Sequence, residues 1–87
     1  MKNGFIVSGP LAREYRNEPE KLSAKMDHVK DAWKSEGVIL QSWGRSHENN
    51  DECIFCMETD ESRETVDRLT ADIPVNPPTT QSYTLAD

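Results

Sequence analysis

Residues 38–59 read VILQSWGRSHENNDECIFCMET, and this stretch decides the fold. Two apolar runs, at 38–43 and 53–57, flank a polar run at 45–51 that is rich in turn-forming residues. This arrangement is typical of a β-hairpin. Shorter strands are expected near the two chain ends, at 5–7 and 83–85. The sequence between each outer strand and the hairpin then has to cross over the sheet.

The first crossover has the periodicity of an amphipathic helix. Four large apolar residues recur at spacings of four, three and four, which places them on one helical face: Leu22, Met26, Val29 and Trp33. Asn17 is the expected N-cap, with Pro19 in the first turn. Gly37 is expected to end the helix in the left-handed conformation.

The second crossover predicts a shorter helix around Val66 and Leu69, capped by Asp60 and ended before Pro74. The element order is therefore strand, helix, strand, strand, helix, strand. That βαββαβ order is the ferredoxin-like pattern of an α+β protein, with a four-stranded antiparallel sheet and two helices on one face. Residues 1–87 are predicted to form one such domain, because no linker or repeat divides them.

Both hairpin strands are apolar on both of their faces. Alternation places Cys53, Phe55 and Met57 on one face and Ile54 and Cys56 on the other. The same count places Val38 and Leu40 opposite Ile39 and Trp43. A sheet with one face in water alternates between apolar and polar residues. One face is thus expected to meet the helices, and the other to meet a partner or to line an apolar pocket.

Charge and composition exclude several classes of partner. The net charge is −6, which disfavours binding to nucleic acid and to anionic membranes. No apolar run approaches the ~20 residues of a membrane span, and the N-terminus lacks a secretion signal. We expect a soluble cytoplasmic protein.

Cys53 and Cys56 form a C-x-x-C motif on a predicted strand. Three steps along a strand separate two residues by about 10 Å and turn them to opposite faces. A disulfide needs Cα atoms closer than about 7 Å, and His28 and His47 do not complete a zinc-binding spacing. Two ordinary strand cysteines, with no metal site, are predicted.

Three runs resemble the dimeric α+β barrel superfamily, and within it the muconolactone-isomerase-like and YCII-related proteins. They are EGVILQSWGR at 36–45, IFCMETD at 54–60 and LTADIPV at 69–75. The resemblance implies a homodimer whose two sheets face each other around small apolar pockets. It also implies cofactor-free chemistry on small organic molecules, by isomerases, cyclases or monooxygenases.

The resemblance to YCII-related proteins implies that His28 and Asp72 are the catalytic pair. Cofactor-free proton transfer needs a group with a pKa near neutrality beside an apolar pocket. The match departs from the family in one place, because Ile73 stands between Asp72 and Pro74. Helical geometry rotates His28 about 130° from the apolar stripe, which directs it to solvent.

Four residues are candidates for substrate binding. Trp43 is the expected pocket-lining ring, although dimer packing alone would also explain it. Arg45 at a strand end is suited to hold a carboxylate. His47 acts only if its polar loop folds over a pocket, and Tyr83 offers a hydroxyl from the last strand.

Two classes of function follow from these features. The first is a cofactor-free enzyme or ligand-binding barrel, which transfers a proton on a small apolar or carboxylate-bearing metabolite. The second is a non-catalytic homodimeric interaction module. A cavity of roughly 300 Å³ with a titratable residue favours the first, and a fully packed interface favours the second. A cofactor-free monooxygenase, of the heme-degrading or quinone-oxidising kind found in the same superfamily, is a third possibility, placed last because no histidine is suited to ligate heme.

Overall fold

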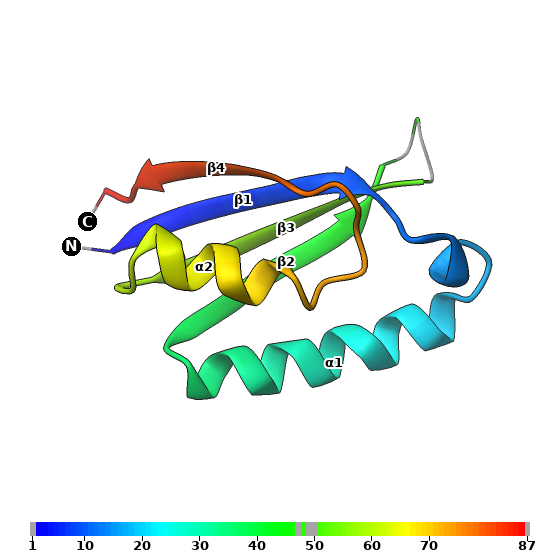
Figure 1. Ribbon diagram of the computed structural model, residues 1–87, viewed down its shortest axis with the longest axis horizontal. Coiled ribbons are helices and arrows are strands. Elements are labelled where there is room, and N and C mark those ends of the chain that lie inside the picture. The colour runs from blue at the N-terminus through cyan, green and yellow to red at the C-terminus, as the bar shows by residue number, and fades with distance from the viewer. Residues whose placement is uncertain (1, 47, 49–50, 87) are drawn as a thin grey trace.

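The computed structural model describes residues 2–46, 48 and 51–86, which form one four-stranded antiparallel sheet, two α-helices and a short 3₁₀ helix (Figure 1). The elements in chain order are β1 (Asn3–Pro10), η1 (Arg13–Tyr15), α1 (Pro19–Ser35), β2 (Val38–Arg45), β3 (Glu52–Thr59), α2 (Arg63–Thr70) and β4 (Thr79–Thr84). The strand order is β2-β3-β1-β4. This is the ferredoxin-like α+β fold, so the predicted fold class is confirmed.

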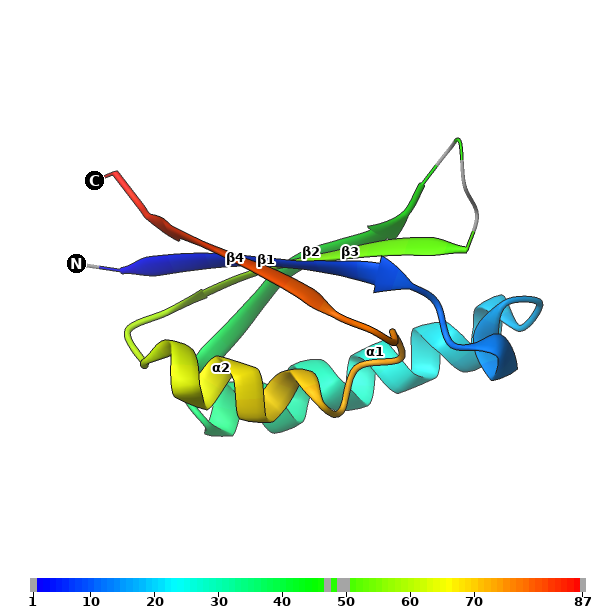
Figure 2. The same cartoon turned by 45° about the horizontal axis from the view of Figure 1, so that its top comes forward.

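Both helices lie on the same side of the sheet, and no helix of the described residues lies on the opposite side (Figure 2). The core fills the space between the sheet and the helices. Its fully buried side chains come from α1, α2, the helix-facing positions of the strands and Leu11, which follows β1. The largest are Trp33, Phe55, Leu11, Leu22 and Met26. We call the uncovered side the outer face of the sheet.

Helix α1 buries the four-residue apolar stripe that the periodicity predicts, from Leu22 to Trp33. It ends at Gly37, whose φ of +82° is the left-handed conformation that favours glycine. The cap at the other end was predicted wrongly. Glu18, not Asn17, is the N-cap, and no side chain caps the helix there. Pro19 alone sets the start, because its ring fixes φ and it lacks the N–H that would need a partner.

Helix α2 is capped by Ser62, whose hydroxyl accepts a hydrogen bond from the Thr65 amide at 3.4 Å. The prediction of Asp60 as the cap was wrong because β3 continues as far as Thr59. The Thr59 hydroxyl accepts a hydrogen bond from the Glu61 amide at 2.9 Å, which turns the chain before the helix begins. The helix therefore starts two residues later than its acidic residue suggests.

A β-bulge in β2 corrects the predicted faces of this strand. Leu40 pairs with Met57 and Ser42 pairs with Cys56, so Gln41 is an extra residue in the ladder. Trp43 then pairs with Phe55 and lies on the helix side, where it is half-buried against the core. Simple alternation had placed Trp43 on the outer face, and one inserted residue reverses every position after it.

The segment between α2 and β4 packs into the core although it has no regular structure. Ile73, Pro74 and Val75 are buried, and Val75 forms a β-bridge with Leu11. The Ala12 amide donates to the Pro74 carbonyl at 2.7 Å. These contacts fix the turn that carries Asp72 close to the middle of α1, where Lys25 and His28 line the same cavity.

Candidate functional site

The outer face of the sheet carries exposed apolar side chains. Ile39 on β2 is 42% exposed and Ile54 on β3 is 44% exposed. Tyr83 on β4 is 48% exposed and pairs with Gly4 of β1. Isolated apolar residues are common on protein surfaces, but these three share one face of the sheet, which no helix of the described residues covers.

A pocket of about 440 Å³ lies on this face, toward the end where β1 begins. Ile6, Cys56, Tyr83 and Leu85 supply most of its apolar wall. A Cβ atom at Gly4 would lie 2.7 Å from the Leu85 side chain, so glycine is needed for Leu85 to close that wall. We call this cavity the outer-face pocket.

The edge of the outer-face pocket is polar. Gln41, which lines it, donates from its amide to a Glu58 carboxylate oxygen at 2.6 Å. Lys2 lies 3.4 Å from the other oxygen of Glu58. The Tyr83 hydroxyl donates to the side-chain oxygen of Gln81 at 2.8 Å. The pocket thus combines an apolar wall with a few fixed polar groups, which is the usual composition of a small-molecule site.

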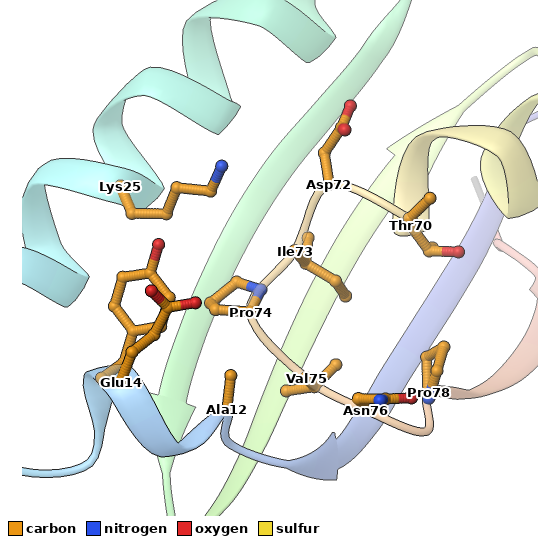
Figure 3. Close-up of a pocket in the computed structure, with 12 residues that line it drawn as sticks. Ala12, Glu14, Lys25, Thr70, Asp72, Ile73, Pro74, Val75, Asn76 and Pro78 are labelled. Carbon is orange, nitrogen blue, oxygen red and sulfur yellow. The ribbon is translucent and has the colours of Figure 1, made fainter.

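A second concave region lies on the helix side, between α1 and the turn after α2. It consists of two cavities, of about 420 and 160 Å³, that share Lys25 and Asp72. The larger is also lined by Glu14 and Tyr15, and Lys25 extends from α1 toward the turn that carries Asp72 (Figure 3). We call this region the helix-side cleft.

The predicted catalytic pair is brought together in this cleft. His28 and Asp72 both line the smaller cavity. His28 is exposed, as helical geometry predicts, so it lies at the edge of the cavity. Neither residue lies on the outer face, so the pair is separated by the sheet from the pocket that contains Tyr83. Their catalytic role stays a prediction.

The remaining predicted binding residues are dispersed. Trp43 packs against the core on the helix side. Arg45, at the end of β2, donates to the main-chain carbonyl of Arg16 at 3.1 Å, so it holds the segment that precedes α1. His47 lies outside the described residues. Of the four, Tyr83 alone lines the outer-face pocket among the parts of the chain that the structure describes.

The two cysteines are free thiols on opposite faces of β3, as predicted from strand geometry. Cys53 is fully buried on the helix side. Burial raises the pKa of its thiol, against a smaller lowering by the charge of Arg45. Cys56 lies half-buried in the wall of the outer-face pocket. Among the described residues, no group of three His, Cys, Asp or Glu side chains is placed to hold a metal ion.

Solved structures share this fold at low sequence identity. A candidate antibiotic biosynthesis monooxygenase from Nitrosomonas europaea is 12% identical, with a TM-score of 0.62 over 94% of this chain and 88% of that one. Rv0793 from Mycobacterium tuberculosis is 14% identical, with a TM-score of 0.61 over 100% and 97% of the two chains. An antibiotic biosynthesis monooxygenase of known crystal structure is 9% identical, with a TM-score of 0.63 over 98% and 99%.

No protein-family model and no curated protein sequence matches this chain. The similar structures support the ferredoxin-like fold, and they do not confirm the finer resemblance to muconolactone isomerase and YCII-related proteins. Within the described residues, no helix is long and apolar enough to cross a membrane.

Sequence reasoning missed several residues that line the two regions. Gln41 was missed because the alternation of apolar and polar residues in this strand does not reveal the bulge at Gln41. Leu85 joins the outer-face pocket because its side chain lies over Gly4, which has no side chain of its own. Lys25 lies three residues before His28 on α1, so helical spacing could have placed it beside that histidine.

Proposed function

We propose that two copies of this chain pair through their outer sheet faces and that the outer-face pocket binds a small, mainly apolar molecule. The observation that carries this proposal is an apolar pocket of about 440 Å³ on a sheet face that no helix covers. A second copy would remove Ile39 and Ile54 from water and would close the open side of the pocket. The shared fold of the similar structures supports a small ligand-binding barrel.

The charges of the pocket favour a neutral ligand over a carboxylate. Glu58 lies at its edge, and it would repel a bound anion. Arg45, the predicted carboxylate partner, does not line this pocket. The Gln41 amide and the Tyr83 hydroxyl are suited to orient a single polar group on an otherwise apolar molecule.

The pairing is tested by light scattering coupled to size-exclusion chromatography. Wild type is expected near twice 9.9 kDa. Ile54→Lys places a charge at the centre of the outer face and is expected to give a monomer. Ala24→Lys adds the same charge at an exposed position of α1, and it should leave the dimer intact. A wild-type monomer at all concentrations would refute the pairing.

Ligand binding is tested with the neutral fluorescent probe N-phenyl-1-naphthylamine. Cys56→Phe places a ring in the pocket and should weaken probe binding about tenfold or more, equivalent to about 1.4 kcal/mol. Cys56→Ala changes the volume little and should bind the probe as wild type does. Equal binding by both variants would show that the probe binds elsewhere.

A cofactor-free monooxygenase is the second candidate, and the names of two of the similar structures favour it. Such a reaction inserts one oxygen atom of O₂ and reduces the other to water with electrons from the substrate. The substrate must then be an easily oxidised arene; 1-naphthol, for example, would yield 1,4-naphthoquinone and water. The test is protein-dependent uptake of O₂ with 1-naphthol, reduced in the Cys56→Phe variant. No uptake above the rate without protein would count against oxidation of this arene.

A proton-transfer role for His28 and Asp72 stays a prediction, supported by the cavity they share. It requires a substrate that reaches the helix-side cleft rather than the outer-face pocket.

A further inference from the structure

One carboxylate lies among the apolar side chains of the outer-face pocket. Glu58 is at an outer-face position of β3, where it pairs with Gly4 of β1 and with Ile39 of β2. Tyr83 of β4 pairs with Gly4 in turn, so these residues form one row across the sheet. Gly4 adds no side chain to this row, and the Leu85 side chain lies over it instead. Among the described residues, Glu58 is the one charged side chain that lines the pocket.

Neighbouring side chains hold the Glu58 carboxylate in place and leave part of it available to a ligand. Its side chain is 25% exposed, so most of it has left water. One oxygen accepts a hydrogen bond from the Gln41 amide at 2.6 Å, and the other lies 3.4 Å from the Lys2 ammonium. A carboxylate offers about four lone-pair sites and no donor. The two contacts leave lone pairs of Glu58 for a further hydrogen-bond donor.

The neighbouring polar side chains of the pocket also offer mainly acceptors. The Tyr83 hydroxyl donates its proton to Gln81 at 2.8 Å, so its oxygen remains as an acceptor. Gln41 donates one amide proton to Glu58 and has a carbonyl oxygen that accepts. Against these acceptors stands the second amide proton of Gln41. The polar part of the pocket therefore favours a ligand that donates a hydrogen bond.

We propose that the outer-face pocket selects an apolar molecule with one neutral hydrogen-bond donor, an O–H or N–H group, and that Glu58 accepts this donor. The inference rests on the proposed ligand pocket and names the class of molecule that it takes. A donor that enters an apolar pocket loses its hydrogen bonds to water. A charged acceptor makes a stronger hydrogen bond than a neutral one, so Glu58 offsets this loss.

Ligands of other chemistry fit this arrangement less well. An anion would meet the negative charge of Glu58 at the pocket wall. A cation would add a second positive charge beside the Lys2 ammonium, which already lies against Glu58. An ether has an acceptor and no donor, so it would place its oxygen against the carboxylate with no proton between them. A neutral donor is the class that matches both the charge and the lone pairs of Glu58.

Matched pairs of ligands test the need for a donor on the wild-type protein. In 1-methoxynaphthalene a methyl group replaces the hydroxyl proton of 1-naphthol, and 1-methylindole differs from indole in the same way. Each ligand is titrated against bound N-phenyl-1-naphthylamine under nitrogen, so that 1-naphthol is not oxidised. 1-Naphthol and indole should each displace the probe at concentrations about tenfold or more below those of their methylated partners. The cation 1-(aminomethyl)naphthalene should bind more weakly than 1-naphthol.

A substitution at Glu58 tests the acceptor itself. Glu58→Gln keeps the size of the side chain and removes its charge, so the preference for 1-naphthol over 1-methoxynaphthalene should fall about tenfold or more. Glu64→Gln makes the same change at an exposed position of α2 and should keep the wild-type preference. Circular dichroism checks that both variants are folded, and the ligand pairs decide the matter on wild type in any case.

The outcomes separate this inference from the pocket on which it rests. Equal displacement by the methylated and unmethylated ligands, tighter binding of the cation, or an unchanged preference in folded Glu58→Gln would overturn the inference alone. Probe binding that does not respond to Cys56→Phe would refute the proposed pocket, and this inference with it.

Discussion

Replacement of Trp33 by phenylalanine is expected to change stability very little, although Trp33 lies at the centre of the core. Its side chain is only 1% exposed, and residues at such sites usually tolerate truncation badly. Trp33 differs from its neighbours because its Nε1 is buried without a hydrogen-bond partner. Phenylalanine keeps most of the ring and removes the unpaired donor, so two opposing terms decide the result.

The two terms are similar in size. The smaller ring buries roughly 50 Å² less surface, which costs about 1.2 kcal/mol at 25 cal/mol/Å². If the surrounding side chains do not fill the space left by the indole, the remaining cavity lowers the free energy of unfolding by a further amount, at most about 1 kcal/mol. Removal of a buried unpaired donor recovers about 1–3 kcal/mol. The free energy of unfolding of Trp33→Phe should therefore lie between about 1 kcal/mol below and about 2 kcal/mol above the wild-type value.

Urea denaturation of both proteins at one protein concentration measures this difference, because the proposed pairing of two copies would make the midpoint depend on concentration. Trp33→Ala is the reference for full truncation and should lose about 3–5 kcal/mol. A loss above roughly 3 kcal/mol in Trp33→Phe would refute the reasoning, because it would mean that the indole N–H makes a stabilising hydrogen bond.

Three further predictions test local features of the fold at Gly37, Ser62 and Cys53. Gly37→Ala should lower the free energy of unfolding, measured by urea denaturation, by about 1–2 kcal/mol. The cause is the backbone φ of +82°, because the new Cβ would meet only ordinary contacts. Gly44→Ala, where a Cβ would meet nothing within 4 Å, should lower it much less. Ser62→Ala should lower the free energy of unfolding by about 0.5–2 kcal/mol, whereas Asp60→Ala should have little effect if Ser62 is the true cap. Burial raises the pKa of Cys53 above 9.0, so its protonated thiol favours the folded state at lower pH. This contribution is lost as pH rises above that value, so stability relative to Cys53→Ala should fall as pH rises above about 9; an unchanged difference would contradict it.

Much of the fold could be predicted because its signals are local. The stripe on α1 repeats at helical spacing, and all four of its residues are buried. The alternation in β3 placed Cys53 and Cys56 on opposite faces, where the structure has them. Gly37 ended the helix in the predicted conformation. Each of these features depends on the backbone geometry of one element, so a few neighbouring residues are sufficient to specify it.

The errors arose where one element depends on another. Asn17 and Asp60 have the chemistry of helix caps, but the packing of adjacent segments moved both helix starts. The face of Trp43 was inverted by the bulge at Gln41, which exists only in the pairing of β2 with β3. Residue type alone does not contain this information, because a bulge is a property of two strands together.

The features of the candidate sites also divide into those that the sequence predicts and those that only the tertiary structure decides. The sequence by itself determined the element order, the buried stripe and an outer face with apolar residues, because periodicity encodes which side of each element avoids water. The tertiary structure alone decided that His28, Lys25 and Asp72 share a cavity behind Trp33. It also decided that Tyr83 lies on the other side of the sheet. These residues are tens of positions apart in the sequence, and the helices that cross over the sheet bring them together or separate them. Burial of apolar surface drives this packing, and because it is non-directional, it does not specify which polar residues become neighbours.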